Sequence, residues 1–275
     1  MREVYDIAYQ GVAGSFGNIA ALKYTHNSSN ALACKHFCDV FDSLEQGKAI
    51  CGILPIENST TGGVATVYDL LIKYGYYIID EVCIKIEHNL LGVKGTKLED
   101  IRYVYSHPQA IMQSEEYLQS NNWDLIPYTN TAASAKYISE CNDKTKAAVA
   151  SIKASEIYDL AVLSSNINSN NSNYTRFIVI GSNLVRKVSN DKISIVVSVP
   201  HKAGALCNIL KHFSENSINL LKIESRPIKD KPWEYLFHID FEGNLNNSVV
   251  IDALKNIKEN SCHYKLLGNY KSYNG

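Results

Sequence analysis

The sequence lacks the signatures of several protein classes. Its seven cysteines include no Cys-x-x-Cys pair, and only His36 lies between Cys34 and Cys38 as a further ligand, which argues against a metal site. The formal net charge of −1 gives no basic excess for nucleic-acid binding. The N-terminus has no apolar signal core, and no apolar run is long enough to span a membrane. We therefore expect a cytoplasmic protein with reduced, mostly buried thiols that binds neither nucleic acid nor membranes.

With 275 residues, the chain is long enough for two domains with separate cores. From Val4 to Gly181, strand-like apolar runs alternate with helical patterns, which predicts a largely parallel sheet covered by helices. Residues 183–192 are polar and charged, as is typical of a domain boundary. The following pattern predicts a βαββαβ split α/β sandwich. We thus expect one domain over residues 1–182 and a second over 192–270.

Specific elements are expected in both domains. In the first, the patterns predict helices over 18–24, 64–73, from 108 onward, 131–141 and 152–158, with an extended segment over 76–86 that crosses between lobes. In the second, they predict strands over 193–199, 218–225, 235–241 and 263–267, and helices over 205–213 and 249–257.

Four loops that follow expected strands carry small hydroxyls, amides and helix-start N–H groups. These loops span residues 14–16, 55–63, 106–109 and 130–132. In an open α/β domain such loops converge at the carboxyl ends of the strands, where their neutral donors suit a carboxylate or a phosphate. The glycines do not form a phosphate loop, because the Walker lysine is missing, and Gly11 and Gly14 do not match the dinucleotide fingerprint.

Thr175 lies where a Ser- and Asn-rich loop, residues 164–173, becomes a β-branched strand. Side chains alternate along a strand, so Thr175 and Phe177 are expected on one face and Arg176 on the other. On these grounds alone Thr175 could be an ordinary strand residue. Ser59 and His107 suggest a nucleophile and a base, but no Gly-x-Ser-x-Gly elbow is present, and His107 before Pro108 is typical of a helix start.

Read together, these motifs resemble those of the prephenate dehydratase family over nearly the whole chain. The segments that carry the resemblance are residues 11–21, 55–71, 106–110, 131–135, 147–151 and 173–181. The segments 204–206 and 223–227 resemble the ACT regulatory domain of that family. The resemblance implies an α/β fold, with a two-lobed, periplasmic-binding-protein-like catalytic domain followed by the βαββαβ ACT-like domain. No chorismate mutase helices precede Met1, so the chain resembles the stand-alone enzyme.

The resemblance implies a lyase that converts prephenate to phenylpyruvate, with loss of water and carbon dioxide, in L-phenylalanine biosynthesis and without a cofactor. Thr175, in the family's Thr-Arg-Phe motif, would be the catalytic residue that protonates or positions the leaving hydroxyl. Asn58, Ser59 and Thr131 would donate hydrogen bonds to the substrate carboxylates, although Ser59 and Thr131 could be plain N-caps. The expected substrate-binding residues are Ser15, Glu57, Asn58, Ser59, Ser106, Gln109, Thr131, Ala132, Arg176 and Phe177.

Three of these roles stay open in the sequence. Glu57 would repel an anionic substrate, so it is expected either to orient Asn58 or to pair with Arg176. Arg176 points away from Thr175 and is expected behind the residues that touch the substrate. Phe177 forms either an apolar wall for the ring or part of the core. The chain departs from the family pattern at Val12, Gly17, Ser169 and Ala203, none of which touches Thr175.

The ACT-like segment predicts an effector site. Gly204 opens a helix whose N–H groups suit an amino-acid carboxylate, and the end of the second strand would line the same site across a subunit interface. The expected effector-binding residues are Gly204, Ala205, Leu206, Glu224, Ser225, Arg226 and Pro227. The resemblance implies L-phenylalanine as the allosteric effector and a homodimer or homotetramer.

Three other functions share features with this sequence. A solute-binding protein shares the two-lobed architecture, but no export signal precedes it. A ligand-sensing regulator would keep the fold without the chemistry, but we find no basic recognition helix. An arogenate dehydratase differs only in the amine that its substrate carries in place of the side-chain ketone, and the sequence does not separate it from a prephenate dehydratase.

Overall fold

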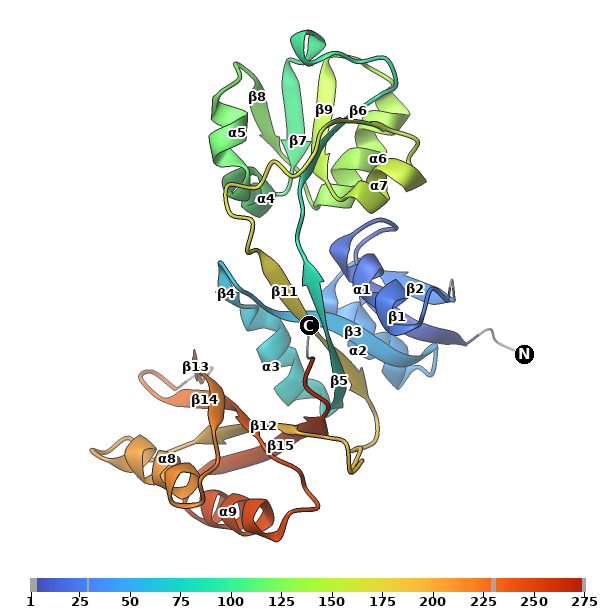
Figure 1. The fold of residues 1–275 in the computed structure, drawn as a ribbon. Coiled ribbons are helices and arrows are strands. Elements are labelled where there is room, and N and C mark those ends of the chain that lie inside the picture. The colour runs from blue at the N-terminus through green and yellow to red at the C-terminus, as the bar shows by residue number, and fades with distance from the viewer. Residues whose placement is uncertain (1–3, 29, 229–230, 274–275) are drawn as a thin grey trace. The chain divides into compact units, whose positions relative to one another are not determined.

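The computed structural model, drawn in Figure 1, describes residues 4–28, 30–228 and 231–273. The chain divides into two compact units. The first unit comprises Met1–Gly62 and Cys83–Phe177, and the second comprises Gly63–Val82 and Ile178–Gly275. Each unit is therefore built from two stretches of chain. No helix among the described residues is long and apolar enough to cross a membrane.

The first lobe of the first unit is a parallel α/β layer. Strand β1 (Tyr5–Gln10) pairs in parallel with both β2 (Ala31–Cys34) and β3 (Ala49–Asn58), and helices α1 (Phe16–Tyr24) and α2 (Phe37–Glu45) pack against these strands. The sequence analysis predicted neither β2 nor α2. The buried side chains of α2 are Val40, Phe41, Ser43 and Leu44, so its apolar face is short and interrupted by a serine.

The second lobe of the first unit is a mixed sheet. Its strands are β6 (Asn89–Gly92), β7 (Tyr103–Ser106), β8 (Asp124–Pro127), β9 (Lys146–Ala150) and β10 (Ala161–Ser164), in the order β10-β6-β9-β7-β8. β7 pairs in parallel with β8 and β9, whereas β6 pairs antiparallel with β9 and β10. The expectation of a largely parallel sheet is therefore wrong for this lobe.

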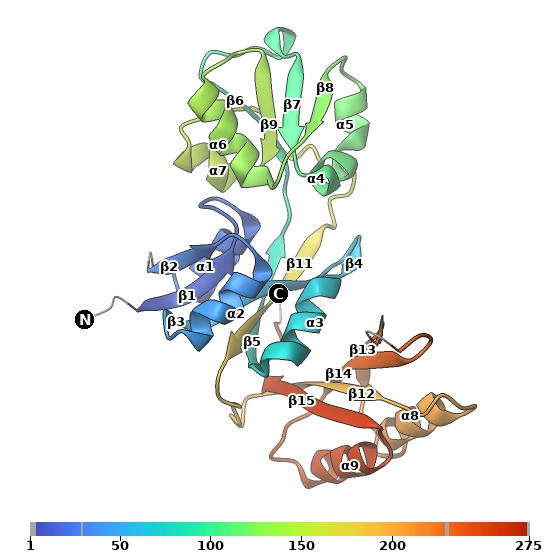
Figure 2. The same cartoon turned by 180° about the vertical axis from the view of Figure 1, so that it is seen from behind.

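Helices cover both faces of this mixed sheet (Figure 2). They are α4 (Pro108–Gln113), α5 (Glu115–Gln119), α6 (Thr131–Cys141) and α7 (Ile152–Ile157), with a short 3-10 turn, η1 (Leu98–Asp100). Alternate residues of β9 enter two separate cores: Ala148 and Ala150 belong to one, and Ala147 and Val149 to the other. Such a two-sided strand forms a continuous apolar run, in keeping with the strand-like apolar runs noted between Val4 and Gly181.

The second unit contains the βαββαβ fold that the sequence predicted. Its elements are β12 (Lys192–Ser198), α8 (Ala205–Glu215), β13 (Leu220–Pro227), β14 (Tyr235–Glu242), α9 (Ser248–Glu259) and β15 (His263–Tyr270). The strands form an antiparallel sheet in the order β13-β14-β12-β15. Its apolar core includes Ile209 and Phe213 of α8, Leu254 and Ile257 of α9, and inward-facing residues of the strands.

A helix from the N-terminal half of the chain, α3 (Ala65–Tyr74), also belongs to the second unit. The ring of its Tyr68 lies 4.5 Å from that of His238 on β14. Lys265 Nζ of β15 donates hydrogen bonds to the carbonyls of Leu71 and Ile72, at 2.9 and 3.0 Å, and so satisfies acceptors that the end of α3 leaves open. α3 is flanked by the two-residue strand β4 (Gly62–Gly63) and by β5 (Tyr77–Lys85), which continues into the first unit.

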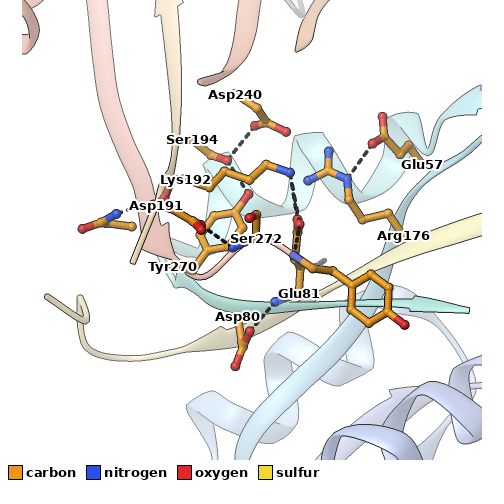
Figure 3. A network of polar contacts seen from close by, with 12 residues as sticks. Glu57, Asp80, Glu81, Arg176, Asp191, Lys192, Ser194, Asp240, Tyr270 and Ser272 are labelled. Carbon is orange, nitrogen blue, oxygen red and sulfur yellow. Dashed lines mark hydrogen bonds and ion pairs between the residues drawn. The ribbon is translucent and has the colours of Figure 1, made fainter. Parts of the chain in front are cut away.

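The second unit also contains a buried ion pair (Figure 3). Lys192 Nζ lies 2.9 and 3.2 Å from the two carboxylate oxygens of Glu81, and the two side chains are 9% and 3% exposed. The backbone N–H of Tyr273 donates a further hydrogen bond to Glu81 at 2.9 Å. Ions this deep in a protein persist only when each has a partner of opposite charge.

We predict that Lys192→Met destabilises the protein by about 3–5 kcal/mol, because the Glu81 carboxylate would stay buried without its ammonium partner. The free energy of unfolding, measured by urea denaturation followed by circular dichroism, checks this. The matched control is Lys211→Met, which breaks a pair with Glu215 whose side chains are 65% and 55% exposed. That control should change the free energy by less than about 0.5 kcal/mol. Equal effects of the two substitutions would contradict the prediction.

Candidate functional site

The site is organised around the side-chain amide of Asn58, which lies at the end of β3 and is 8% exposed. Its Oδ1 accepts four hydrogen bonds, from the backbone N–H groups of Thr60 (3.0 Å) and Thr61 (3.1 Å) and from their hydroxyls (2.6 and 3.2 Å). A backbone N–H can only donate, so Oδ1 must be the atom that faces this turn. The orientation of the amide is thereby fixed.

The amide nitrogen of Asn58 faces the segment that leads into β11 (Tyr174–Gly181). Nδ2 lies 2.7 Å from Asn173 Oδ1, 3.1 Å from the Tyr174 carbonyl and 3.0 Å from Thr175 Oγ1. Because Thr175 Oγ1 accepts this bond, its own O–H remains available as a donor. The Thr175 side chain is largely buried, with 9% of the residue exposed.

Ser59 joins the same two segments. Its hydroxyl accepts a hydrogen bond from Tyr174 N (2.9 Å) and donates one to the carbonyl of Ser172 (3.0 Å), while its backbone N–H donates to the Tyr174 carbonyl (2.8 Å). Ser59 is therefore not a helix cap. The N-cap position of α3 is Val64, which makes no side-chain capping bond.

Glu57 pairs with Arg176. Arg176 Nε lies 2.5 Å from Glu57 Oε1, and the side chains are 12% and 28% exposed, respectively (Figure 3). Pairing with Arg176 was one of the two roles expected for Glu57, and this ion pair is present. The pair neutralises a carboxylate that lies one residue from Asn58, so an anionic ligand at this site would meet less repulsion.

Two glutamines of α4 hold the turn that follows Asn58. Gln109 Nε2 lies 2.8 Å from Thr61 Oγ1, and Gln113 Nε2 lies 3.1 Å from Thr60 Oγ1. The two glutamines are four residues apart and so share one side of the helix. The sequence analysis named Gln109 but missed Gln113, Thr60, Thr61 and Asn173. The sequence did contain one usable signal: the i, i+4 spacing places Gln113 on the same side of the helix as Gln109.

The other predicted substrate-binding residues have the following places in the described structure. Ser15 is the N-cap of α1 and accepts from Asn18 N at 3.2 Å. The Ser106 hydroxyl donates to the Val149 carbonyl at 2.7 Å, and Ser106 and Ala132 are fully buried. Phe177 is 2% exposed, and Thr131 is the first residue of α6.

Two alternatives from the sequence analysis are wrong. Thr131 is not the N-cap of α6, because Asn130 Oδ1 makes the capping bond with Ala133 N at 2.7 Å. Ser59 and His107 do not form a nucleophile–base pair, because His107 Nδ1 accepts from Gln109 N at 3.2 Å and the Ser59 hydroxyl is held by residues 172 and 174. Burial lowers the pKa of His107, in keeping with a neutral ring that caps α4.

The predicted effector-binding residues lie on α8 and β13 of the second unit. Gly204 has a φ of +78° immediately before α8, and a Cβ built there would meet no heavy atom within 4 Å. Glu224 and Arg226 are half-buried, whereas Ser225 and Pro227 are exposed, as expected for a strand with alternating faces. Arg226 Nη2 lies 3.5 Å from Asp69 Oδ2 of α3.

Comparisons with known proteins agree on a family. The family model described as prephenate dehydratase matches residues 7–185, and the ACT-domain model matches residues 193–259. The prephenate dehydratase of Methanocaldococcus jannaschii is 38% identical over 241 residues, which cover 86% of each chain. The arogenate dehydratase/prephenate dehydratase 2 of Arabidopsis thaliana is 36% identical over 96% of this chain and 72% of its own.

Solved structures show the same fold. The prephenate dehydratase of Arthrobacter aurescens, in complex with L-Phe, superposes with a TM-score of 0.88 at 30% identity, over 97% of this chain and 90% of that one. GqqA, described as a novel type of quorum quenching acylase, gives 0.88 at 27% identity, over 97% and 98%. The fold class predicted from the sequence, a two-lobed periplasmic-binding-protein-like domain with a C-terminal ACT domain, is confirmed.

We predict that Asn58→Asp lowers the free energy of unfolding by about 1–3 kcal/mol, because a carboxylate has no hydrogen to give to Asn173, Tyr174 and Thr175. The matched control is Asn130→Asp. Among the described residues the Asn130 side chain only accepts, so the aspartate should cap α6 equally well, and the change should stay within about 0.5 kcal/mol. Urea denaturation of both variants checks the pair, and equal losses would contradict the role given to the amide hydrogens.

Proposed function

Since the chain belongs to the prephenate dehydratase family, we propose that it converts prephenate to phenylpyruvate, water and carbon dioxide in the biosynthesis of L-phenylalanine. In this lyase reaction the bond between the ring and its carboxylate breaks and its electron pair enters the ring. The ring carbon–oxygen bond breaks at the opposite position, and the ring becomes aromatic. One proton is consumed per turnover, because a dianion becomes a monoanion and the hydroxyl leaves as water. The reaction is redox neutral.

The chemistry requires a donor at the leaving hydroxyl and groups that hold two carboxylates. Thr175 is the proposed donor, and the observation that carries this proposal is the bond from Asn58 Nδ2 to Thr175 Oγ1 at 3.0 Å. Asn58 occupies a lone pair of Thr175 and so directs the Thr175 O–H toward another acceptor. A weakly acidic hydroxyl is effective in such a role only when its direction is fixed in advance.

The carboxylates are proposed to meet neutral donors rather than free cations. The α1 and α6 helices begin beside Ser15 and Thr131, and their first-turn N–H groups suit an anion. The charge of Glu57, which precedes Asn58 on β3, is offset by Arg176, which follows Thr175 on β11. Ser106, Ala132 and Phe177 are buried, and their proposed contribution is to support these loops and the ring-binding surface.

Arogenate is the second candidate substrate. The Arabidopsis relative, 36% identical to this chain, is named for both arogenate and prephenate dehydratase activities. Parallel assays with the two substrates decide between them, since each product is distinct: phenylpyruvate or phenylalanine.

The GqqA structure shows that a chain of this fold can be described by another activity, so the fold alone does not fix the reaction. If the protein turned over neither prephenate nor arogenate, the result would support the alternative of a ligand-sensing regulator without catalytic activity.

L-phenylalanine is the proposed allosteric effector. The structure of the Arthrobacter relative contains L-Phe, and residues 193–259 of this chain match the ACT domain. The proposed site uses the N–H groups at the start of α8, after Gly204, together with the end of β13 from Glu224 to Pro227. The coupling to catalysis is expected to be about 1–3 kcal/mol, as for typical allosteric enzymes.

We also propose that the chain forms at least a dimer, either a homodimer or a homotetramer. β13 is the terminal strand in the order β13-β14-β12-β15, and its Leu221 and Ile223 are each 44% exposed. An edge strand with exposed apolar side chains is suited to pairing with a second copy. A site shared across that edge would place the β13 residues of one subunit beside α8 of its partner.

We predict that Thr175→Val lowers kcat for prephenate by at least about 100-fold, because the nearly isosteric side chain has no O–H to donate. Thr175→Ser keeps the hydroxyl and should retain far more activity. Steady-state assays of phenylpyruvate formation, with circular dichroism to verify folding, check this. A folded Thr175→Val variant with near wild-type turnover would remove Thr175 from the mechanism.

We predict that Gly204→Val weakens L-phenylalanine binding by about 10-fold or more, because valine is strained at positive φ and the start of α8 would shift. Gly47→Val is the matched control, since Gly47 has a φ of +64° and also has open space around a Cβ, but lies in the first unit. Calorimetric titration compares the two variants, and light scattering gives their oligomeric state. Undetectable binding to the wild type, or equal binding by both variants, would contradict this effector site.

A further inference from the structure

His88 is a buried histidine that lies outside the proposed substrate contacts. It precedes β6 and is 2% exposed, and its backbone N–H is held by Asn168 Oδ1 at 2.7 Å. Its ring packs edge-on against Phe16, with centroids 5.7 Å apart. Its Nε2 lies 3.0 Å from Gln113 Oε1, while its Nδ1 is buried with no hydrogen-bond partner in the described part of the chain.

Hydrogen bonds connect His88 to Thr175 through three intermediate side chains. The pairs are His88 Nε2 with Gln113 Oε1 (3.0 Å), Gln113 Nε2 with Thr60 Oγ1 (3.1 Å), Thr60 Oγ1 with Asn58 Oδ1 (2.6 Å) and Asn58 Nδ2 with Thr175 Oγ1 (3.0 Å). All of these residues belong to the first unit. They come from four separate places in the sequence, with Asn58 and Thr60 in one turn, so no local motif contains the whole chain of bonds.

The direction of every bond follows from Asn58. Its Oδ1 can only accept, so the single hydroxyl hydrogen of Thr60 points at it. Thr60 Oγ1 must then accept from Gln113, which requires that the amide nitrogen of Gln113 face Thr60 and its oxygen face His88. His88 therefore carries its proton on Nε2 and a bare lone pair on Nδ1, which agrees with the missing partner at Nδ1. Every donor points toward Thr175.

We propose that His88 is a positioning residue, which acts through Gln113, Thr60 and Asn58 to aim the Thr175 hydroxyl at the leaving oxygen. This inference rests on the proposed prephenate dehydratase function. Hydrogen bonds in a buried series polarise one another, so a donor at the far end strengthens those that follow. Burial also lowers the pKa of His88, which favours the neutral ring that the series needs.

If His88 only filled space beside Phe16, substitutions at this position would have different effects on kcat. Packing depends on volume, whereas the series depends on an N–H at the Nε2 position. His88→Met fills much of the same space without a donor, and His88→Gln supplies an amide N–H near the place of Nε2. Thr60→Val removes the middle of the series without touching His88. In a protein that already carries Thr60→Val, His88→Met should lower kcat little further, because the effects of residues that act in series do not add.

The test measures prephenate turnover by the full-length wild type, the three single variants and the His88→Met/Thr60→Val double variant. We expect His88→Met and Thr60→Val each to lower kcat about 10- to 100-fold with KM changed less than about threefold. His88→Gln should recover most of the loss, and the double variant should be no slower than the worse single variant. Wild-type kcat in folded His88→Met, equal kcat for His88→Gln and His88→Met, or multiplied losses in the double variant would each overturn the inference.

If His88→Met does not fold, comparing Thr60→Val with wild type and His88→Gln decides the question, since an unchanged kcat in Thr60→Val refutes the series.

A measurement without turnover separates this inference from the proposed function. Ring 15N shifts of His88 in the substrate-free protein should report the neutral tautomer with its proton on Nε2. A proton on Nδ1 would overturn the inference even in an active enzyme. A wild type that leaves prephenate unchanged, with the Nε2–H tautomer in place, would instead refute the proposed substrate while leaving the hydrogen-bonded series intact.

Discussion

The amide of Asn58 is the contact on which the candidate site depends. It lies at the end of β3, and residues 173–175 lie more than a hundred positions later in the chain. The two backbone N–H groups of the following turn fix the oxygen of the amide, and its nitrogen then gives hydrogen bonds to the start of β11. Hydrogen bonds to the backbone are directional and costly to leave unmade when buried. One side chain thus joins two strand ends. By donating to Thr175 Oγ1, it also leaves the O–H of Thr175 to donate to another group.

The charged residues next to Asn58 and Thr175 neutralise each other. Glu57 precedes Asn58 on β3, and Arg176 follows Thr175 on β11. The two charged side chains pair with one another. Their neighbours Asn58 and Thr175 are neutral. An anionic ligand would therefore be recognised mainly by dipoles and hydrogen bonds, whose directions are fixed by the fold, rather than by a mobile cation. Preorganised dipoles are effective at a developing charge because they need no rearrangement when that charge appears.

Much of the fold was predictable because its signals are local. The α6 helix was predicted over 131–141, where the structure places it, and the βαββαβ order was predicted from strand and helix periodicity. β2 and α2 were missed because the strand is short and half exposed and the helix buries only a narrow face. The N-cap of α6 was misplaced by one residue, since Asn130 and Thr131 are both good caps and only the coordinates show which one bonds to Ala133.

The site itself was less predictable. Thr175, Asn58 and Gln109 stood out because their motifs resemble those of a family, but the part played by Gln113 and His88 arises from contacts between segments distant in sequence. No periodicity in one stretch of chain reveals which hydroxyl a distant amide will reach. Ser106 and Ala132 show the reverse case: their motif suggested contact with a ligand, yet the structure buries both, and the Ser106 hydroxyl is committed to Val149.

The position of α3 has a consequence for dissecting the protein. Its Tyr68 and Leu71 are 5% and 0% exposed, and its last carbonyls receive hydrogen bonds from Lys265 near the end of the chain. A fragment that stopped after β11 would retain the helix but lose β14 and β15, leaving an aromatic ring and two carbonyl groups to the solvent. Limited proteolysis within the polar residues 183–192 would therefore yield an N-terminal fragment that exposes apolar surface on α3 and tends to aggregate. Producing the catalytic segment alone would require polar replacements on that helix.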